Sequence, residues 1–519
     1  MSVPAVHPFH GGLVLEGHKR ISTRHPVVPA RLPERLVVPL QQHIGAPAEP
    51  VVQVGERVLK GQPIARPRGY VSAAVHAPSS GTVAAIEARP VPHPSGLAAP
   101  CIVIETDGEE RWRWREDQRP DWRTLGPEAL RERVREAGIV GMGGAGFPTH
   151  VKLNPGAGRA IHTLVINGAE CEPYITCDDM LMREHAPAVV AGAQVMQRIL
   201  GARRILIGIE SDKPEAREAL SEAVRAAGAD DIRVVSVPAR YPSGGERQLI
   251  HLLTGLEVPS EGLPADIGVV CQNAATAAAV LRAVTELEPL ISRIVTVTGA
   301  GVAEPRNLEV LVGTPFADVI DQAGGYTDEA VRLIVGGPMM GFAVAHDEVP
   351  VTKTVNCLLV AGRGEVEPAR DPLPCIRCGA CVEACPARLL PQQLYWYARA
   401  KDFDRVQDYR LFDCIECGCC AAVCPSRIPL VDYYRYAKSE IWALEREREK
   451  AARARRRHEA RLARLERERA EREARQRARR ERATDAAARK AAVAEALARA
   501  GARRSGSAEA RRHEGSEGG

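Results

Sequence analysis

The sequence has no run of about 18 or more uninterrupted apolar residues, the length a helix needs to span a bilayer. The best candidate, residues 267–284, is interrupted by Gln272, Asn273, Thr276 and Arg282. The N-terminal residues MSVPAVHPFHGG also lack the basic and apolar regions of a secretory signal peptide. We therefore expect no membrane-spanning helix and no signal peptide, so any contact with a membrane should be peripheral.

A disulfide pattern is also missing. Of the 14 cysteines, eight fall in two regular runs. The others are scattered along the chain: Cys101, Cys171, Cys177, Cys271, Cys357 and Cys419. Free thiols beside two regular cysteine runs are typical of a protein from a reducing cytosol.

The net charge of +4 combines two regions of opposite sign. Residues 443–519 contain 24 Lys and Arg against 14 Asp and Glu, a net charge of +10, which leaves −6 for residues 1–442. This tail is mostly Ala, Arg and Glu, which favour helix. For 441–519 we expect a solvated helix or a disordered tail. Contact with anionic lipid or a partner subunit is the alternative. Interleaved Glu and the lack of aromatics argue against nucleic acid as a partner.

The two cysteine runs share one spacing, C-x2-C-x2-C-x3-C-P, and are offset by 39 residues. The first run is Cys375, Cys378, Cys381 and Cys385, followed by Pro386, and the second is Cys414, Cys417, Cys420 and Cys424, followed by Pro425. Four thiolates at this spacing bind a cubic iron–sulfur cluster. Structural zinc usually takes two separated pairs of ligands, so it does not explain runs of four followed by proline. Cys419 breaks the spacing and is expected not to be a ligand.

In two-cluster ferredoxins the fourth cysteine of each run binds the other cluster. We therefore expect one [4Fe–4S] cluster on Cys375, Cys378, Cys381 and Cys424, and a second on Cys414, Cys417, Cys420 and Cys385. The 28 residues between the runs include a helical stretch at 391–398. Residues 365–440 are thus predicted to form an α-helical ferredoxin domain.

Residues 1–125 are rich in Val, Pro and Gly, which predicts a small β domain. The pattern V-G-x-x-V-x-x-G-Q-x-I at 54–64, with A-P-x-x-G-x-V at 77–83, resembles the barrel-sandwich half-repeats of biotinyl and lipoyl domains. Those domains carry a modified Lys between the halves, but no Lys lies between Gly61 and Gly81. We expect the barrel-sandwich scaffold without the swinging arm; an unrelated β module is the alternative.

Residues 126–290 alternate between helical and strand-like segments, which predicts a Rossmann-like α/β domain with a parallel sheet. Helices are expected at 128–137, 186–200 and 214–227. Strands are expected at 163–166, 204–209, 232–237 and 267–270. Residues 291–350 then give strand, helix and strand in a short span, which resembles the soluble-ligand-binding β-grasp (SLBB) domains. Ligand binding and plain packing both remain open for that module.

Four polar segments of the α/β domain suggest a flavin and nucleotide site. They are the glycine-rich loop at 141–152 and the loops at 167–174, 241–246 and 271–276. Glycines let the backbone approach a phosphate, and loops after parallel strands converge on the edge of the sheet where ligands bind. Amide and hydroxyl side chains can bind a flavin, and carboxylates can accept hydrogen bonds from ribose.

These segments resemble the NADH-oxidising subunit of respiratory complex I. The run G-x-G-G-A-G-F-P-T-x-x-K is similar to its flavin loop, and N-G-A-E-C-E-P-Y, Y-P-S-G-G-E and N-A-A-T are similar to three further motifs. By this resemblance noncovalent FMN would be lined by Gly141, Gly143, Gly144, Gly146, Lys152, Asn167, Asn273 and Thr276. The interface between FMN and NADH would be lined by Glu170, Glu172, Tyr241 and Glu246. Ala169 and Cys171 depart from the family pattern.

With the β domain, the β-grasp module, the two cysteine runs and the tail, the chain over about residues 5–440 resembles the C subunit of the Rnf (or Rsx) electron-transport complex. The resemblance implies a peripheral subunit on the cytoplasmic side of the bacterial inner membrane. It would pass electrons between NADH and ferredoxin-type carriers through FMN and two clusters, beside ion-translocating partner subunits that include an iron–sulfur subunit. No side chain need act as a catalytic acid or base. A soluble NADH:ferredoxin-type dehydrogenase and a flavin-free iron–sulfur relay are the alternatives.

Overall fold

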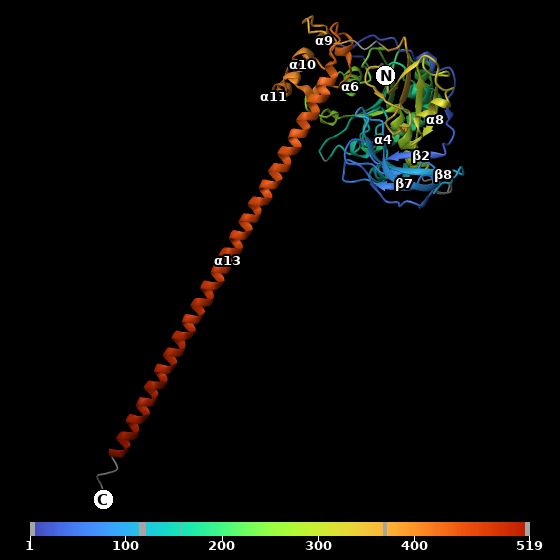
Figure 1. Cartoon of the computed structure of the whole chain (residues 1–519). Helices are drawn as coiled ribbons and strands as arrows, with labels where there is room; N and C mark the ends of the chain where they lie inside the picture. The colour runs from blue at the N-terminus through green and yellow to red at the C-terminus, as the bar shows by residue number, and fades with distance from the viewer. Residues whose placement is uncertain (1–5, 114–120, 157, 367–370, 514–519) are drawn as a thin grey trace. The chain divides into compact units, whose positions relative to one another are not determined.

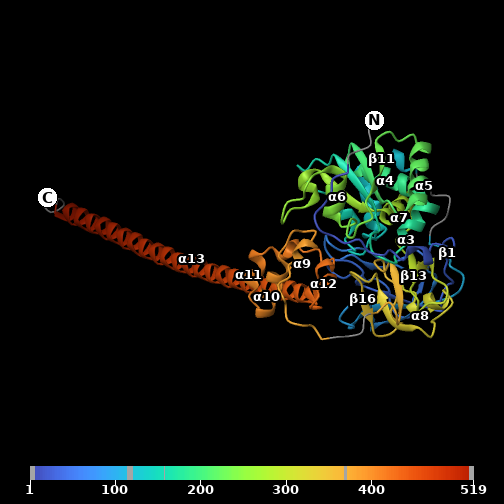
Figure 2. The ribbon, with the colours of Figure 1, turned by 90° about the horizontal axis from the view of Figure 1, so that it is seen from above.

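The protein is described by a computed structural model that covers residues 6–113, 121–156, 158–366 and 371–513. The chain divides into two units, Met1–Lys438 and Ser439–Gly519. The first unit contains every predicted binding residue. Figures 1 and 2 show the helices and strands of the chain in two views. No helix of the described residues is both long and apolar enough to cross a membrane.

The N-terminal β module has two small sheets around one apolar core, as expected for a barrel-sandwich scaffold. One sheet has the order β2-β8-β7-β4 and the other β3-β5-β6. The strands are β2 Arg35–Pro39, β3 Glu49–Pro50, β4 Arg57–Val58, β5 Pro63–Arg66, β6 Val75–His76, β7 Gly81–Pro90 and β8 Ala98–Thr106. Leu36, Ile64 and Ile104 are fully buried between the sheets. The two expected half-repeats thus supply one shared core.

The α/β module is built on a parallel sheet in the order β11-β10-β9-β12. Its strands are β9 Thr163–Gly168, β10 Arg204–Glu210, β11 Ile232–Val237 and β12 Val269–Asn273. Its helices are α1 Pro127–Glu136, α2 Thr149–Lys152, α3 Cys177–Glu184, α4 Ala186–Leu200, α5 Pro214–Ala226, α6 Glu246–Thr254 and α7 Ala274–Thr285. Both faces are covered, since Leu164 packs with the α4 and α7 side and Val165 packs with α6. The predicted Rossmann-like class is confirmed.

The third module has a six-stranded sheet in the order β1-β14-β13-β17-β15-β16, with α8 packed on it. The bounds are β1 Val28–Pro29, β13 Ser292–Thr298, β14 Arg306–Leu311, α8 Phe316–Asp321, β15 Ala330–Val335, β16 Phe342–Val344 and β17 Cys357–Gly362. The sheet therefore extends past residue 350 and recruits a strand from the N-terminal region, where Val28 lies in register with Leu308.

The cysteine module consists of short helices, as the spacer between the runs predicted. They are α9 Ala380–Glu383, α10 Pro391–Ala400, α11 Phe403–Asp408 and α12 Cys419–Ala422. α9 and α12 occupy equivalent positions in the two cysteine runs, so the sequence repeat is also a structural repeat. The chain then enters α13, Leu430–His513, which forms the whole described tail.

Candidate functional site

Several predicted site residues lie where the order of the parallel sheet reverses. From β9 the chain adds β10 and β11 on one side, whereas β12 pairs with the other side of β9. Loops after strands that flank such a reversal point form ligand sites. Asn167 at the end of β9 is in register with Asn273 at the end of β12, so two of the predicted residues are neighbours. The Asn273 side chain also caps α7, accepting a hydrogen bond from the Thr276 N–H at 3.2 Å.

The glycine-rich loop packs against the start of α7. The Gly141 N–H donates to the Phe147 carbonyl at 2.8 Å and closes the loop. The Met142 N–H donates to Thr276 Oγ1 at 2.9 Å. A Cβ on Gly143 would lie 3.4 Å from Asn273 Cβ. The structure therefore brings the glycine loop together with Asn273 and Thr276, at a helix N-terminus whose dipole favours a phosphate.

Two glycines of this loop adopt left-handed backbone conformations, with φ of 108° at Gly144 and 63° at Gly146. A Cβ on Gly146 would lie 2.7 Å from Thr354 Cγ2, so a side chain there is excluded by packing. A Cβ on Gly144 would meet no heavy atom of the described residues within 4 Å. Backbone free of side chains beside a helix N-terminus fits the phosphate end of a flavin nucleotide.

Lys152 and Glu246 form an ion pair across the site, with Nζ 2.7 Å from Oε1. Lys152 ends α2 and Glu246 begins α6, so the pair ties the glycine-loop side to the opposite face of the sheet. Burial acts to lower the pKa of Lys152, but the charge and hydrogen bond of Glu246 together with Cys271 hold this pKa above the ordinary value. A lysine cation is thus fixed within the predicted site.

The loop after β9 makes contacts within the protein at each of its predicted residues. Asn167 Nδ2 donates to the Gly244 carbonyl at 2.8 Å. The Glu170 carboxylate accepts from the Asp178 and Asp179 N–H groups at 2.7 and 3.1 Å, and so caps α3. Burial raises the pKa of Glu170 to about 8, against the opposing effect of Lys19. Glu170 therefore shapes this loop through α3.

Glu172 and Tyr241 reach away from the glycine loop to other modules. Glu172 Oε1 accepts from the Met339 N–H at 2.7 Å, in the loop between β15 and β16. The Tyr241 hydroxyl donates to the Cys417 carbonyl at 2.7 Å, in the second cysteine run. The predicted residues thus divide into a group around the glycine loop and a pair that joins this domain to its neighbours.

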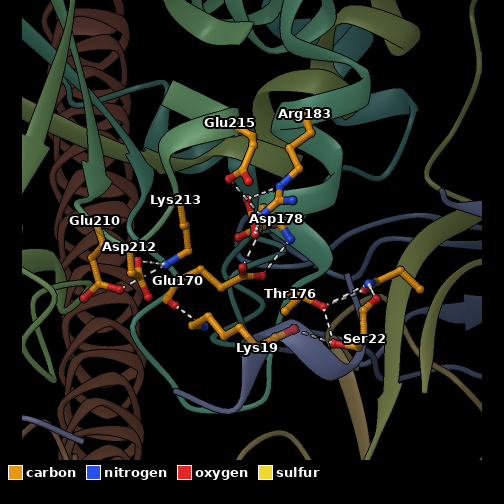
Figure 3. A network of polar contacts seen from close by, with 12 residues as sticks. Lys19, Ser22, Glu170, Thr176, Asp178, Arg183, Glu210, Asp212, Lys213 and Glu215 are labelled. Atoms are coloured by element: carbon orange, nitrogen blue, oxygen red, sulfur yellow. Dashed lines mark hydrogen bonds and ion pairs between the residues drawn. The ribbon is translucent and has the colours of Figure 1, made fainter. Parts of the chain in front are cut away.

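Sequence reasoning missed three charged residues that support the site, of which Figure 3 labels Lys19 and Asp178. Lys19 Nζ donates to the carbonyls of Glu170, Glu172 and Ile175 at 2.8, 2.9 and 2.7 Å. It is far away in the sequence, within no recognised motif, so no local signal could reveal it.

The other two lie behind the glycine loop. Asp178 accepts from Asn273 Nδ2 at 2.5 Å, and burial raises the pKa of its carboxyl. Arg293, which is 1% exposed, donates to the Met142 carbonyl at 3.1 Å from strand β13. Buried charges of this kind persist only where they are paired or hydrogen-bonded, as here.

The eight run cysteines collect into two cavities in the predicted groups of four. Cys375, Cys378, Cys381 and Cys424 line a cavity of about 480 Å³. Cys385, Cys414, Cys417 and Cys420 line a second of about 20 Å³. Four thiol groups around one space are the donor set that a cubic cluster requires. Cys419 lines neither of these cavities and is fully buried beside Tyr241 instead.

Four family models match the chain in the order of its modules. Residues 7–109 match the RnfC barrel sandwich hybrid domain, and residues 134–282 match the Nuo51 FMN-binding domain. Residues 294–343 match the SLBB domain, and residues 374–428 match the 4Fe-4S dicluster domain. The expected cofactors, FMN and two [4Fe–4S] clusters, are therefore confirmed at the level of the domains.

Curated relatives match about nine tenths of the chain. A Pseudomonas aeruginosa protein, named as the C subunit of an ion-translocating oxidoreductase complex, is 53% identical over 464 residues, covering 89% of this chain and 59% of that protein. Proteins of the same name from Vibrio cholerae and Yersinia pestis are 50% and 48% identical over 462 residues. Each match covers 89% of this chain, with 59% of the Vibrio protein and 73% of the Yersinia protein. The chain thus spans about three fifths of the length of the first two relatives.

Solved structures also resemble part of the fold. A NAD+-reducing [NiFe]-hydrogenase in its H2-reduced state has a TM-score of 0.46 and 21% identity, covering 59% of this chain and 61% of that chain. The air-oxidised state has a TM-score of 0.43 and 22% identity, covering 57% of each chain.

Proposed function

The chain belongs to the family of C subunits of ion-translocating oxidoreductase complexes, and from this premise we propose that it is the NADH-linked electron-transfer subunit of such a complex. One contact carries the proposal. The Tyr241 hydroxyl of the FMN-binding domain donates to the Cys417 carbonyl of the cysteine module at 2.7 Å. A flavin site and a cluster site are therefore neighbours within one unit of the chain.

The residues around the glycine loop would hold FMN. The amides at Gly143 and Gly144, which donate to no acceptor among the described residues, suit its phosphate together with the α7 N-terminus and the Thr276 hydroxyl. Lys152 supplies a fixed positive charge, and Asn167 and Asn273 supply amide groups for the remaining polar atoms. FMN can take a hydride from NADH and release electrons singly, as iron–sulfur clusters require.

The NADH side of the site is assigned to Glu170, Glu172, Tyr241 and Glu246. Glu246 supports this best, because it begins α6 beside Lys152 and about two fifths of its side chain is exposed. A carboxylate there can accept hydrogen bonds from ribose hydroxyls. The protein's part is to orient the nicotinamide and to keep water from the flavin.

The cysteine residues would bind two [4Fe–4S] clusters in the groups that line the two cavities. Partner subunits of the complex, including an iron–sulfur subunit, would exchange electrons with ferredoxin-type carriers and move ions. The chain would sit peripherally on the cytoplasmic side of the inner membrane. The family name and the acidic body with a basic tail are compatible with this location.

Anaerobic reconstitution tests the proposal. The purified chain is loaded with iron, sulfide and FMN, NADH is added, and flavin absorbance is followed together with cluster EPR. We expect the flavin to bleach and the clusters to become reduced. Clusters that respond to dithionite in a chain that never binds FMN would instead make it a flavin-free relay.

Association with membranes separates the proposal from a soluble dehydrogenase. When the other subunits of the complex are present, the chain should stay with the membrane fraction, and it should be released when they are absent. A chain that oxidises NADH but stays in the supernatant in both cases would be a soluble NADH:ferredoxin-type enzyme.

A further inference from the structure

The two cysteine runs have the same cysteine spacing and matching backbone conformations. Gly379 and Gly418 are 39 residues apart, precede α9 and α12, and have φ of 83° and 80°. Arg377 and Glu416, also 39 residues apart, both have φ of 58°. The backbone conformation therefore does not distinguish the two cluster sites, whereas their surroundings do.

The surroundings of the two runs differ sharply. A Cβ on Gly418 would lie 2.9 Å from the Met339 carbonyl oxygen, in the loop between β15 and β16. A Cβ on Gly379 would meet no heavy atom within 4 Å anywhere in the described chain. In the same way, Cys417 is buried, with 7% of its surface exposed, whereas the equivalent Cys378 is exposed to solvent. The second run is packed against other modules around Cys417 and Gly418, whereas the equivalent part of the first run, around Cys378 and Gly379, faces solvent.

A short N-terminal segment, Gly11–Leu13, completes the packing of the buried site. The Gly12 N–H donates to the Ala384 carbonyl at 3.0 Å, next to Cys385. Leu13 and Tyr241 exchange two backbone hydrogen bonds of 2.7 and 2.8 Å, and the Tyr241 hydroxyl reaches Cys417. This segment therefore contacts the residue before Cys385 directly and Cys417 through the Tyr241 hydroxyl, and both cysteines line one cavity.

The segment approaches so closely that only glycine fits. Gly11 and Gly12 have φ of 69° and 79°. A Cβ on Gly11 would lie 2.7 Å from the Cys385 carbonyl carbon, and one on Gly12 would lie 2.5 Å from the Tyr241 carbonyl oxygen. Leu13 also packs in a small apolar cluster with Tyr241 and Cys417. The contact therefore depends on glycine, which allows both the left-handed backbone and the close approach.

We propose that the two cluster sites are an inner and an outer site. The inner site, Cys385, Cys414, Cys417 and Cys420, is seated against the flavin-binding domain by Gly11–Leu13, Tyr241 and the Met339 loop. The outer site, Cys375, Cys378, Cys381 and Cys424, opens to solvent. Gly12 and Gly418 are positioning residues for the inner cluster. The inference rests on the proposed function for its cofactors.

The first test compares two substitutions at equivalent positions, Gly418→Ala and Gly379→Ala. Both place a Cβ on a left-handed residue, so their backbone strain is matched. Only the first also collides with the Met339 loop. After anaerobic reconstitution, iron content and dithionite-reduced EPR are measured, with signals assigned through Cys417→Ala and Cys378→Ala. Gly418→Ala should lose the inner cluster or shift its midpoint potential, and Gly379→Ala should disturb its own cluster clearly less. Equal effects at the two positions would overturn the proposal.

The second test acts from outside the cysteine module. Gly12→Ala collides with the Tyr241 carbonyl, whereas Gly17→Ala, five residues later, makes only an ordinary 3.6 Å contact with Lys19 Cγ. Gly12→Ala should lose up to one cluster's share of iron from the inner site while the outer signal persists. If the inner-cluster EPR signal of Gly12→Ala equals that of Gly17→Ala in spin count and in midpoint potential, Gly11–Leu13 does not support the inner site.

These measurements do not depend on the NADH reaction. Dithionite reduces clusters directly, so the tests succeed or fail whether or not FMN or NADH binds. If NADH fails to bleach the flavin in the unchanged chain, the proposed function fails while the inner and outer assignment is still decided by EPR. FMN content and thermal stability of Gly12→Ala identify a variant that has simply unfolded, in which case the Gly418 and Gly379 pair decides.

Discussion

At the scale of single residues, the Lys152–Glu246 pair separates flavin binding from nucleotide binding. Glu246→Gln keeps an oxygen that can accept from Lys152 but removes the charge. If Glu246 orients NADH, this variant should retain FMN while the NADH concentration needed for half-maximal bleaching rises by about tenfold or more, because the hydrogen bond to NADH loses its charged acceptor. Flavin absorbance per chain and bleaching at several NADH concentrations measure the two effects. Loss of FMN from Glu246→Gln would reassign this residue to the flavin.

Lys152→Met is the matched experiment on the other half of the pair. It removes the cation that the proposal places beside FMN, so FMN content should fall while the iron content stays unchanged. Fluorescence of released FMN and an iron assay on the same sample measure this. A Lys152→Met chain that still binds FMN fully would contradict the role given to Lys152.

Lys353 provides a prediction about pH. Its ammonium is buried where three modules meet and donates to the carbonyls of Ala74 and Gly138 at 2.8 Å each. Burial lowers its pKa from 10.5 to about 7. Between these values the folded state binds fewer protons than the unfolded state, so the free energy of unfolding rises with pH. The destabilisation caused by burying the Lys353 ammonium is complete below about pH 7 and disappears above about pH 10.5.

The matched variant is Lys353→Met, which cannot titrate. Relative to it, the unchanged chain should gain about 2 kcal/mol between pH 7 and about pH 9. Thermal midpoints of both proteins across this range measure the trend, and the difference between them cancels other titrating groups. A constant difference would mean that Lys353 keeps its charge throughout.

Site residues that belong to a local sequence pattern could be predicted, whereas residues that act only through tertiary contacts could not. Cysteine spacing and the glycine-rich loop are encoded over a few positions, so their grouping in space could be anticipated. Lys19 and Arg293 act through backbone carbonyls of Glu170 and Met142. Nothing near them in the sequence signals such contacts, which exist only once distant modules have packed.

At the scale of elements, helices and strands largely follow the periodicity and turn residues of the sequence. The expected helix at 186–200 is α4 with the same bounds. The strand expected at 267–270 begins later, as β12 at Val269. The reason is local: Pro264–Ile267 forms a 3-10 turn that ends on Gly268 with φ of 69°. A proline and a glycine thus set the start of the strand that carries Asn273.

The tail helix α13 should be stable in isolation. Its charged side chains pair at spacings of four residues, as Arg464 with Glu468 and Arg469 with Glu473. Such pairs contribute about 0.2–0.5 kcal/mol each and weaken with salt. A peptide of residues 443–505 is far longer than the roughly 15 residues below which helices are marginal. Circular dichroism should therefore show high helicity that decreases in concentrated salt.

Ala474→Pro is the control for that peptide. A proline in the helix interior costs about 3 kcal/mol and removes a backbone hydrogen bond, so helicity should fall around the substitution. A peptide that is unordered in both forms would mean that the tail needs a partner to become helical. If the helicity of the peptide does not change with salt, its stability comes from helix propensity instead of ion pairs.

At the scale of the whole molecule, the modules are joined by segments that the sequence does not mark. β1 comes from residues 28–29 yet pairs with β14, and Gly11–Leu13 contacts both Tyr241 and the end of the first cysteine run. Local patterns specify each module, but the connections depend on complementary surfaces far apart in the chain. The order of modules could thus be predicted, whereas the different surroundings of two cysteine runs with the same spacing could not.

The division into two units gives the last prediction. All predicted binding residues lie within Met1–Lys438, and residues 443–519 carry the net charge of +10. A chain ending at Ala443 should therefore retain FMN, both clusters and NADH-driven reduction at the rate of the full chain. It should also elute from an anion exchanger at higher salt, because the remaining body carries −6. Cofactor analysis and stopped-flow reduction of the two proteins side by side measure this. Loss of a cluster on truncation would place part of the cluster site's support in the tail, beyond the contacts of Lys438 with Cys414 and Glu416.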